Sequence, residues 1–106
     1  MNFNSVKQTL EESFNKEKSA DVDIDINVTV LSGEHGKFSV AIHNGDCSIT
    51  NSHLDKADIT VGFINEETML EMFIQGANPM SLVMGGKMSV NGDLKKGKEI
   101  KGLFVN

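Results

Sequence analysis

Strict alternation over residues 21–30 constrains the fold of this chain more than any other feature. Polar side chains, among them three aspartates, alternate there with β-branched apolar ones, which are Val22, Ile24, Ile26, Val28 and Val30. Alternation with a period of two places apolar side chains on one face of a β-strand and polar ones on the other. β-Branched residues also favour strands. The segment therefore predicts a strand with one face against a core and one face in water.

The same alternation predicts further strands around residues 38–42, 47–50, 59–63 and 88–91. Asn44-Gly45 separates the first two of these, and this dipeptide favours a two-residue hairpin turn. Cys47 occupies an inward-facing position on the segment that follows. The strand around Met88 and Val90 is expected at an edge of the sheet.

Apolar residues at spacings of three and four predict helices. An N-terminal helix carries the stripe Phe3, Val6, Leu10 and Phe14, and Ser5 with Gln8 matches a capping box. Near the C-terminus, a last helix after Gly92-Asp93 is expected to carry Leu94, Ile100, Leu103 and Phe104, with Gly97 and Gly102 weakening it.

Two helices are expected between the fourth and fifth strands. Asn65 offers an N-cap to a helix that ends at Gly76, and Asn78-Pro79 opens a short apolar helix stopped by Gly85-Gly86. Strands in a run followed by helices predict an α+β domain whose helices cover one face of a sheet. Residues 1–106 are long enough for one such domain.

Charge and composition exclude several classes of partner. The net charge is −5, and the chain has neither Trp nor Tyr, so the basic face and stacking platforms of a nucleic-acid binder are missing. Charge is uneven: residues 1–86 carry five lysines and 13 acidic residues, whereas residues 87–106 carry five lysines and two acidic residues. This basic segment is interpreted as a solvated helix face or as a weak docking surface for anionic headgroups at a membrane.

Several features indicate a cytoplasmic protein. One cysteine, Cys47, leaves no partner for an internal disulfide and suits a reducing compartment. The polar N-terminus does not resemble a signal peptide, and the C-terminus lacks a peroxisomal Ser-Lys-Leu address. No apolar run approaches the length that crosses a bilayer.

No residue pattern predicts catalysis, a metal or a cofactor. His35, His43 and His53 lack metal-ligand spacing and are expected in or beside turns. Cys47 is expected as a small core residue. Asp21, Asp23 and Asp25 occupy every second position and are expected on the solvated face of the first strand, with each carboxylate about 7 Å from the next.

Residues 69–88 are rich in methionine and contain one phenylalanine: Met69, Met72, Phe73, Met80, Met84 and Met88. Such a stripe is typical of a core. Flexible methionines also suit binders of varied apolar ligands, and small-molecule pockets are largely apolar. Both interpretations remain open on this evidence.

Four motifs, taken together, resemble the sterol carrier protein-2 family. They read ADITV at 57–61, NEE at 65–67, GANP at 76–79 and MGGKMSVNGD at 84–93. The order of helix and strands upstream of them is similar as well. The resemblance implies a five-stranded, mainly antiparallel sheet with helices over one face and an apolar tunnel between the layers. It also implies binding and transfer of a fatty acid, fatty acyl-CoA, phospholipid or sterol without catalysis.

The resemblance further implies which residues line the tunnel: Met69, Met72, Phe73, Met80, Met84, Met88, Val90, Leu103 and Phe104. Lysines near the entrance are candidates to attract a headgroup, namely Lys87, Lys95, Lys96 and Lys98. Three of these follow Gly92-Asp93, where family members are more apolar. A protein-interaction module, or an accessory domain of a lipid-related enzyme, is the alternative.

Overall fold

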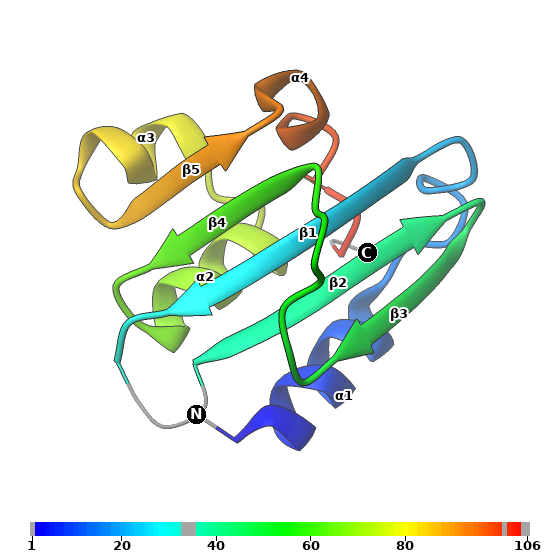
Figure 1. Cartoon of the computed structure of the whole chain (residues 1–106), viewed down its shortest axis with the longest axis horizontal. Coiled ribbons are helices and arrows are strands. Elements are labelled where there is room, and N and C mark those ends of the chain that lie inside the picture. The colour runs from blue at the N-terminus through cyan, green and yellow to red at the C-terminus, as the bar shows by residue number, and fades with distance from the viewer. Residues whose placement is uncertain (1, 33–35, 101, 105–106) are drawn as a thin grey trace.

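One mixed β-sheet forms the centre of the molecule (Figure 1). The structure is a computed structural model that describes residues 2–32, 36–100 and 102–104. Its strands are β1 (Asp23–Val30), β2 (Lys37–His43), β3 (Asp46–Thr50), β4 (Ile59–Phe63) and β5 (Met88–Gly92), in the order β3-β2-β1-β4-β5. The α+β prediction is confirmed.

Strand pairing is antiparallel except at the centre of the sheet. β1 and β4 run parallel, with Ile26 opposite Ile59 and Val28 opposite Val61. The other pairs, β1–β2, β2–β3 and β4–β5, are antiparallel. Alternation identified each strand, but it carries no information on the direction of a neighbour. The mainly antiparallel sheet is therefore confirmed, with one parallel pair that the sequence pattern did not reveal.

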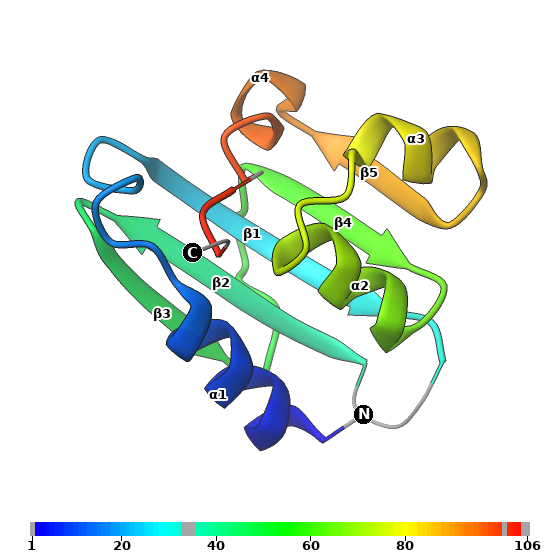
Figure 2. The same ribbon diagram turned by 180° about the vertical axis from the view of Figure 1, so that it is seen from behind.

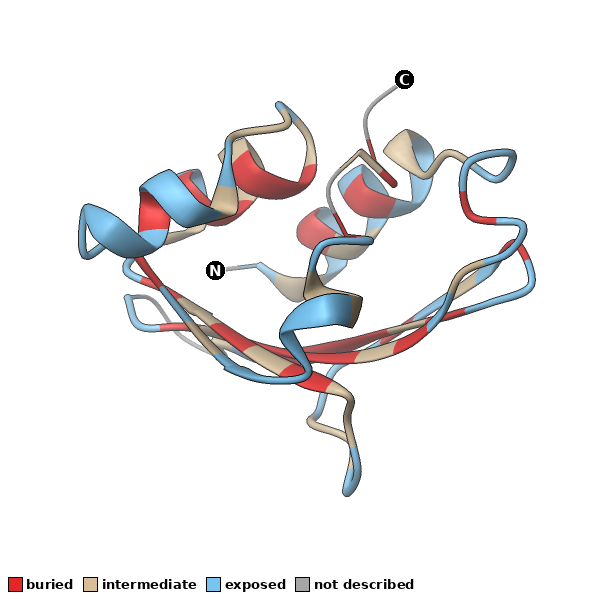
Figure 3. Ribbon diagram, turned by 90° about the horizontal axis from the view of Figure 1, so that it is seen from above, coloured by how far each residue is buried: buried red, intermediate tan, exposed pale blue. Residues whose placement is uncertain are grey.

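Helices lie on one face of this sheet, as predicted (Figure 2). They are α1 (Phe3–Ser13), α2 (Glu66–Phe73), α3 (Pro79–Met84) and α4 (Leu94–Gly97). Figure 3, viewed from above, places them on the concave side of the curved sheet. Within the described ranges, no helix combines the length and the apolar character that crossing a bilayer requires.

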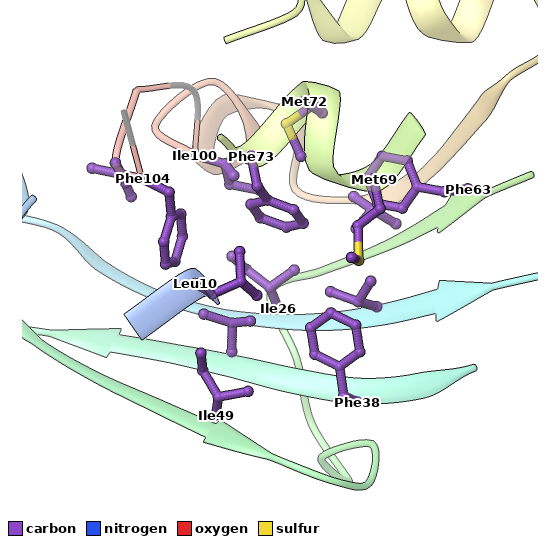
Figure 4. Packing of buried hydrophobic residues seen from close by; sticks show 14 of the residues in the cluster. Leu10, Ile26, Phe38, Ile49, Phe63, Met69, Met72, Phe73, Ile100 and Phe104 are labelled. Carbon is purple, nitrogen blue, oxygen red and sulfur yellow. The ribbon is translucent and has the colours of Figure 1, made fainter. Parts of the chain in front are cut away.

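The apolar core lies between the sheet and the helices (Figure 4). Ile24, Ile26 and Val28 of β1 have no exposed surface, as the alternation predicted. Phenylalanines link the layers: the ring of Phe73 in α2 lies 6.0 Å from that of Phe63 in β4 and 5.5 Å from that of Phe104. The last contact has edge-to-face geometry, which adds to the stability that burial supplies.

The face of the sheet away from the helices is crossed by the connection between β3 and β4. Asn27 of β1 holds this connection, because its side-chain amide donates to the carbonyl of Leu54 (3.0 Å) and accepts from the N–H of Leu54 (2.8 Å). His53 Nε2 lies 3.3 Å from Thr29 Oγ1. These polar contacts, together with those between Asp58 and the backbone of Asp25, hold the segment against the sheet.

Helix caps follow the sequence in three cases and depart from it in one. Asp93, after Gly92, caps α4 by accepting from the N–H groups of Lys95 and Lys96. Asn65 and Asn78 cap α2 and α3 as predicted, accepting from the N–H groups of Thr68 and Met80. The expected capping box of Ser5 is wrong, since Asn2 accepts from the Ser5 N–H instead and the helix starts at Phe3. Starting there keeps Phe3 on the apolar face of α1, in contact with Phe38.

The predicted C-terminal helix is wrong in extent. α4 ends at Gly97 after a single turn, and Leu94 within it is 62% exposed. Ile100, Leu103 and Phe104 are buried, but they reach the core from turns. Gly97 lies so close to β4 that an added Cβ would stand 2.7 Å from Ile59 Cδ1. The backbone at Gly97 therefore packs directly against β4, and the chain continues in turns instead of as a longer helix. α2 likewise ends at Phe73, ahead of the Gly76 expected to stop it.

Candidate functional site

Residues that the resemblance placed around a tunnel meet in the apolar layer between α2 and the sheet. Met69, Met72 and Phe73 project from α2, and each is at most 1% exposed. Leu103 and Phe104 join them from the C-terminal turns, at 3% and 0% exposure. Figure 4 shows the side chains of Met69, Met72, Phe73 and Phe104 in this layer. The structure therefore brings these predicted residues together.

β5 supplies the border of the same layer. Met88 is 7% exposed and pairs with Phe63 of β4, whereas Val90 is half-buried. β5 lies at the edge of the sheet, so it bounds the layer on that side.

The other two predicted methionines lie outside the layer. Met80 and Met84 belong to α3, where they are 65% and 82% exposed. Val83 on the same helix is 39% exposed, and Leu82 is its one buried residue. α3 thus contributes little to the core and presents apolar side chains at the surface.

A surface hollow of about 90 Å³ lies where β1, β4 and the start of β5 meet. Its lining includes Leu31, Phe63, Ile64, Lys87 and Met88. Leu31 is 74% exposed and Ile64 is 40% exposed. Neither was selected from the sequence. Leu31 follows the buried Val30, and Ile64 follows the buried Phe63. Both are therefore apolar at positions where the alternation predicts a polar side chain.

A larger hollow, of about 450 Å³, lies between the start of β2 and the segment that follows β3. It is lined by Gly36, Lys37, Asn51, Ser52 and His53, which are polar or small, and it borders residues outside the described part of the chain. Neither hollow is lined by Met69, Met72 or Phe104.

The four candidate lysines divide into two kinds. Lys87, Lys95 and Lys98 are exposed. Lys96 is bound to the protein itself: its Nζ donates to Asp58 Oδ1 (3.3 Å) and to the Asp23 carbonyl (3.2 Å). This ion pair, together with the Asp25 N–H that the Asp58 carboxylate accepts, holds the pKa of Asp58 below its ordinary value, the backbone hydrogen bond being the stronger cause.

His43 lies directly beside the Asn44-Gly45 turn, as the sequence predicted. It is the last residue of β2, and its ring contacts the carboxylates of Asp23 (through Nδ1) and Asp25 (through Nε2, 2.8 Å). Hydrogen bonds to Asp25 and then Asp23 raise the pKa of His43. Asp23 and Asp25 share the face away from the helices, as predicted, while Asp21 precedes the strand. His53 contacts Thr29, as noted above, and His35 lies outside the described residues.

Cys47 is half-buried on β3 and packs against the core. Burial, with a smaller contribution from the charge of Glu11, raises the pKa of its thiol to about 12. A thiol with so high a pKa is a poor nucleophile at neutral pH. Among the described residues, no His, Cys, Asp and Glu side chains are grouped so that they could hold a metal ion.

Solved structures share this fold. A segment of the stereoselective inverting sec-alkylsulfatase Pisa1 from Pseudomonas sp. matches 92% of this chain (TM-score 0.76, 21% identity), and this chain spans 15% of that protein. The UbiJ-SCP2 ubiquinone synthesis protein matches 92% of this chain over 87% of its own length (TM-score 0.69, 12% identity). The sterol carrier protein domain 2 of Helicoverpa armigera matches 91% of this chain over 79% of its own length (TM-score 0.64, 19% identity).

At these identities the structural likeness establishes the fold alone. No protein with a curated description is a significant sequence match. A family model decides the relationship, because the model of the SCP-2 sterol transfer family matches residues 3–105. That match includes all four motifs that carried the resemblance. The chain belongs to the SCP-2 sterol transfer family.

Proposed function

We propose that this chain binds and transfers a lipid, without catalysis, and holds the apolar tail between the sheet and α2. Membership of a sterol transfer family supports lipid binding in general. A fatty acid, a fatty acyl-CoA, a phospholipid or a sterol would each present the apolar group that this layer accepts. Residues 1–106 act as one lipid-binding domain in this proposal.

The weak attachment of α3 is the observation that carries the proposal. α3 has six residues and buries only Leu82, while Met80, Val83 and Met84 remain exposed. Gly76 and Gly86 flank it with φ values of 73°, a conformation that glycine adopts without strain. A short helix held by one side chain between two glycines can move aside at low cost and admit a ligand to the layer behind it.

Met69 and Met72 make room for the tail once α3 has moved. Both are buried, and methionine side chains adapt to new shapes because they are unbranched and flexible. Burial of each CH₂ of the ligand contributes about 0.8 kcal/mol. A long acyl chain therefore binds well even without a specific polar contact. In the open form, Met80 and Met84 would contribute their exposed side chains to the entrance.

Lysines at the surface provide the attraction for an anionic headgroup. Lys87 lines the hollow beside Ile64 and Met88, which makes it the candidate nearest to α3. Lys95 and Lys98 are exposed beyond the other end of β5. Lys96 contributes less, since Asp58 already neutralises it.

A single introduced tryptophan tests where the tail lies. The chain has neither Trp nor Tyr, so Phe73→Trp gives one fluorescent reporter inside the proposed site. We expect a fatty acid brominated along its chain to quench this reporter in a saturable way, near one ligand per protein. Native mass spectrometry of freshly purified wild-type protein identifies the lipid class that co-purifies.

Phe3→Trp is the matched control. Phe3 also packs against the sheet, through Phe38, but it lies on α1 and not on α2. Quenching of the Phe73→Trp reporter alone supports the proposed position of the tail. Equal quenching at both positions places the tail elsewhere, and the absence of any binding, with a ligand-free mass, rejects the lipid-carrier function.

An accessory role is the second candidate. The alkylsulfatase relative uses this fold as a small part of a longer chain, and the exposed side chains of α3 offer a contact surface for a partner. In that case Met69→Ala and Met72→Ala would lower the free energy of unfolding, and no lipid would be bound by either the variants or the wild type.

A further inference from the structure

β5 is an edge strand whose outer side is unpaired in the sheet. It pairs with β4 on one side only, at the end of the order β3-β2-β1-β4-β5. Its residues Ser89 and Asn91 are exposed, and so are Lys87 and Asp93 at its two ends. An exposed edge strand offers a row of N–H and C=O groups to another strand.

The backbone groups that point outward belong to three residues. The N–H of Ile64 donates to the Lys87 carbonyl (3.1 Å), and the N–H of Asp93 donates to the Asp58 carbonyl (2.8 Å). The carbonyl of Lys87 and the N–H of Asp93 therefore point toward β4. Because these groups alternate sides along an antiparallel strand, Met88, Val90 and Gly92 direct theirs away from the sheet.

We propose that two copies of this chain pair through β5, edge to edge and antiparallel, with Val90 of both copies at the two-fold axis. Two strands so aligned would exchange backbone hydrogen bonds at Val90 with Val90, and at Met88 with Gly92. Every outward group of β5 would then have a partner, and the dimer would contain a continuous ten-stranded sheet.

Side chains along β5 are self-complementary in this register. Lys87 of one copy lies opposite Asp93 of the other, which sets opposite charges across the interface twice. Ser89 lies opposite Asn91 on the polar face, and the β-branched Val90 lies opposite itself on the helix face. Opposite charges and β-branched pairs at directly facing positions each stabilise antiparallel strands.

The helices at the two ends of β5 add apolar contacts. Figure 1 shows α3 beside the start of β5 and α4 beyond its end. Antiparallel pairing therefore sets α3 of one copy beside α4 of the other. Met80, Val83 and Met84 are exposed on α3, and Leu94 is 62% exposed on α4. These side chains account for most of the large exposed apolar residues among those described, and the pairing would bring the two helices that carry them near one another.

β3, the other edge, lacks this complementarity. Its residues are Asp46–Thr50, so antiparallel self-pairing about Ser48 sets Asp46 opposite Thr50 and creates no pair of opposite charges. β3 therefore provides the matched control edge. Cys47 on β3, like Val90 on β5, is half-buried. Since Asp46 pairs with His43 beside the two-residue turn, the N–H of Cys47 points away from β2.

Sedimentation equilibrium with interference detection measures the association, because the chain has no Trp or Tyr to absorb light. We expect the wild type to associate to twice its mass of 11.6 kDa. Val90→Pro removes the N–H at the axis from both copies and should weaken the dimer about 10- to 100-fold. Cys47→Pro should leave the dimer unchanged.

A charge exchange tests the register without a proline. Lys87→Glu sets like charges opposite Asp93 and should weaken the dimer about tenfold. Asp93→Lys should do the same by placing lysine opposite Lys87, and it also removes the carboxylate that caps α4 by accepting from the N–H groups of Lys95 and Lys96. A mixture of these two variants should form heterodimers, since each then meets an opposite charge at both ends. Circular dichroism of each variant confirms that it is folded.

Three results would overturn the proposal. The wild type would stay monomeric up to millimolar concentration, or Val90→Pro and Cys47→Pro would have equal effects on the dimer. Failure of the mixed charge variants to associate more tightly than each variant alone would exclude this register, even if Val90→Pro does not fold.

Discussion

At the scale of single residues, Asn27 shows how one side chain joins segments that are far apart in the chain. It is 8% exposed and bonds both backbone groups of Leu54. An apolar side chain at this position would leave those groups without a partner beneath the crossing segment. Alternation placed Asn27 on the polar face, but it did not indicate that another segment covers this part of the face.

Asn27→Ala should lower the free energy of unfolding by about 1–3 kcal/mol, because it leaves the N–H and carbonyl of Leu54 unsatisfied. Urea denaturation followed by circular dichroism measures the change. Asn4→Ala, at an exposed position of α1, is the control and should shift the unfolding midpoint little. Equal shifts for the two variants would mean that the crossing segment is not held through Asn27.

His43 makes stability depend on pH. Its pKa in the folded protein is raised by Asp25 and Asp23 above the ordinary value of 6.5. The protonated ring therefore stabilises the folded state fully below about pH 6.5, and this contribution disappears as the pH rises through the raised pKa. Lys96 and Asp58 lie on the same face, and their ion pair remains charged throughout this range.

Replacement of His43 by Gln should cost more stability near pH 5.5 than near pH 9. Thermal unfolding of wild type and variant at both pH values measures this difference. In an Asp23→Asn, Asp25→Asn background the pH dependence of the His43 effect should vanish. A variant that is equally destabilised at the two pH values would contradict the role of the two carboxylates.

At the scale of elements, α2 and α3 differ sharply although they are neighbours in the chain. α2 buries Thr68, Met69, Met72 and Phe73, whereas α3 buries Leu82 alone. Local opening of an element exposes little apolar surface when few of its residues are buried. α3 should therefore open far more often than α2, independently of global unfolding.

Amide hydrogen exchange tests this difference. The N–H groups of Gly85 and Lys87, which donate to Ser81 and Leu82, should exchange much faster than that of Ile74, which donates to Leu70 at the end of α2. Addition of a bound lipid should slow the α3 amides selectively. Equal protection of the two helices in the free protein would remove the basis for α3 as the movable element.

The elements that the sequence predicted are those whose signals are local. β1 to β5 follow from alternation, and α2 and α3 follow from the caps Asn65 and Asn78. α4 was overestimated because Ile100, Leu103 and Phe104 are apolar at near-helical spacing, yet turns bring them to the core. These residues are apolar because they are buried in the core, and a residue can be buried without lying in a helix.

At the scale of the whole molecule, the candidate site was predictable in its centre and not at its border. Met69, Met72 and Phe73 lie together because a single helix carries them. The exposure of Met80 and Met84 depends on how α3 rests on β5, which no local pattern encodes. Leu31 and Ile64 belong to strands that are distant in sequence, so the hollow they share with Lys87 appears only when the sheet is assembled.

The parallel pairing of β1 with β4 joins strands that are distant in sequence, and this separation bears on the order in which we expect the chain to fold. β1, β2 and β3 follow one another in the sequence, so their contacts are between residues close in the chain and are expected to form fast. Between Val30 and Ile59 the chain must instead close a long loop, which costs more entropy and slows folding. We therefore expect the parallel pairing at the centre of the sheet to form after β1, β2 and β3 have paired with one another.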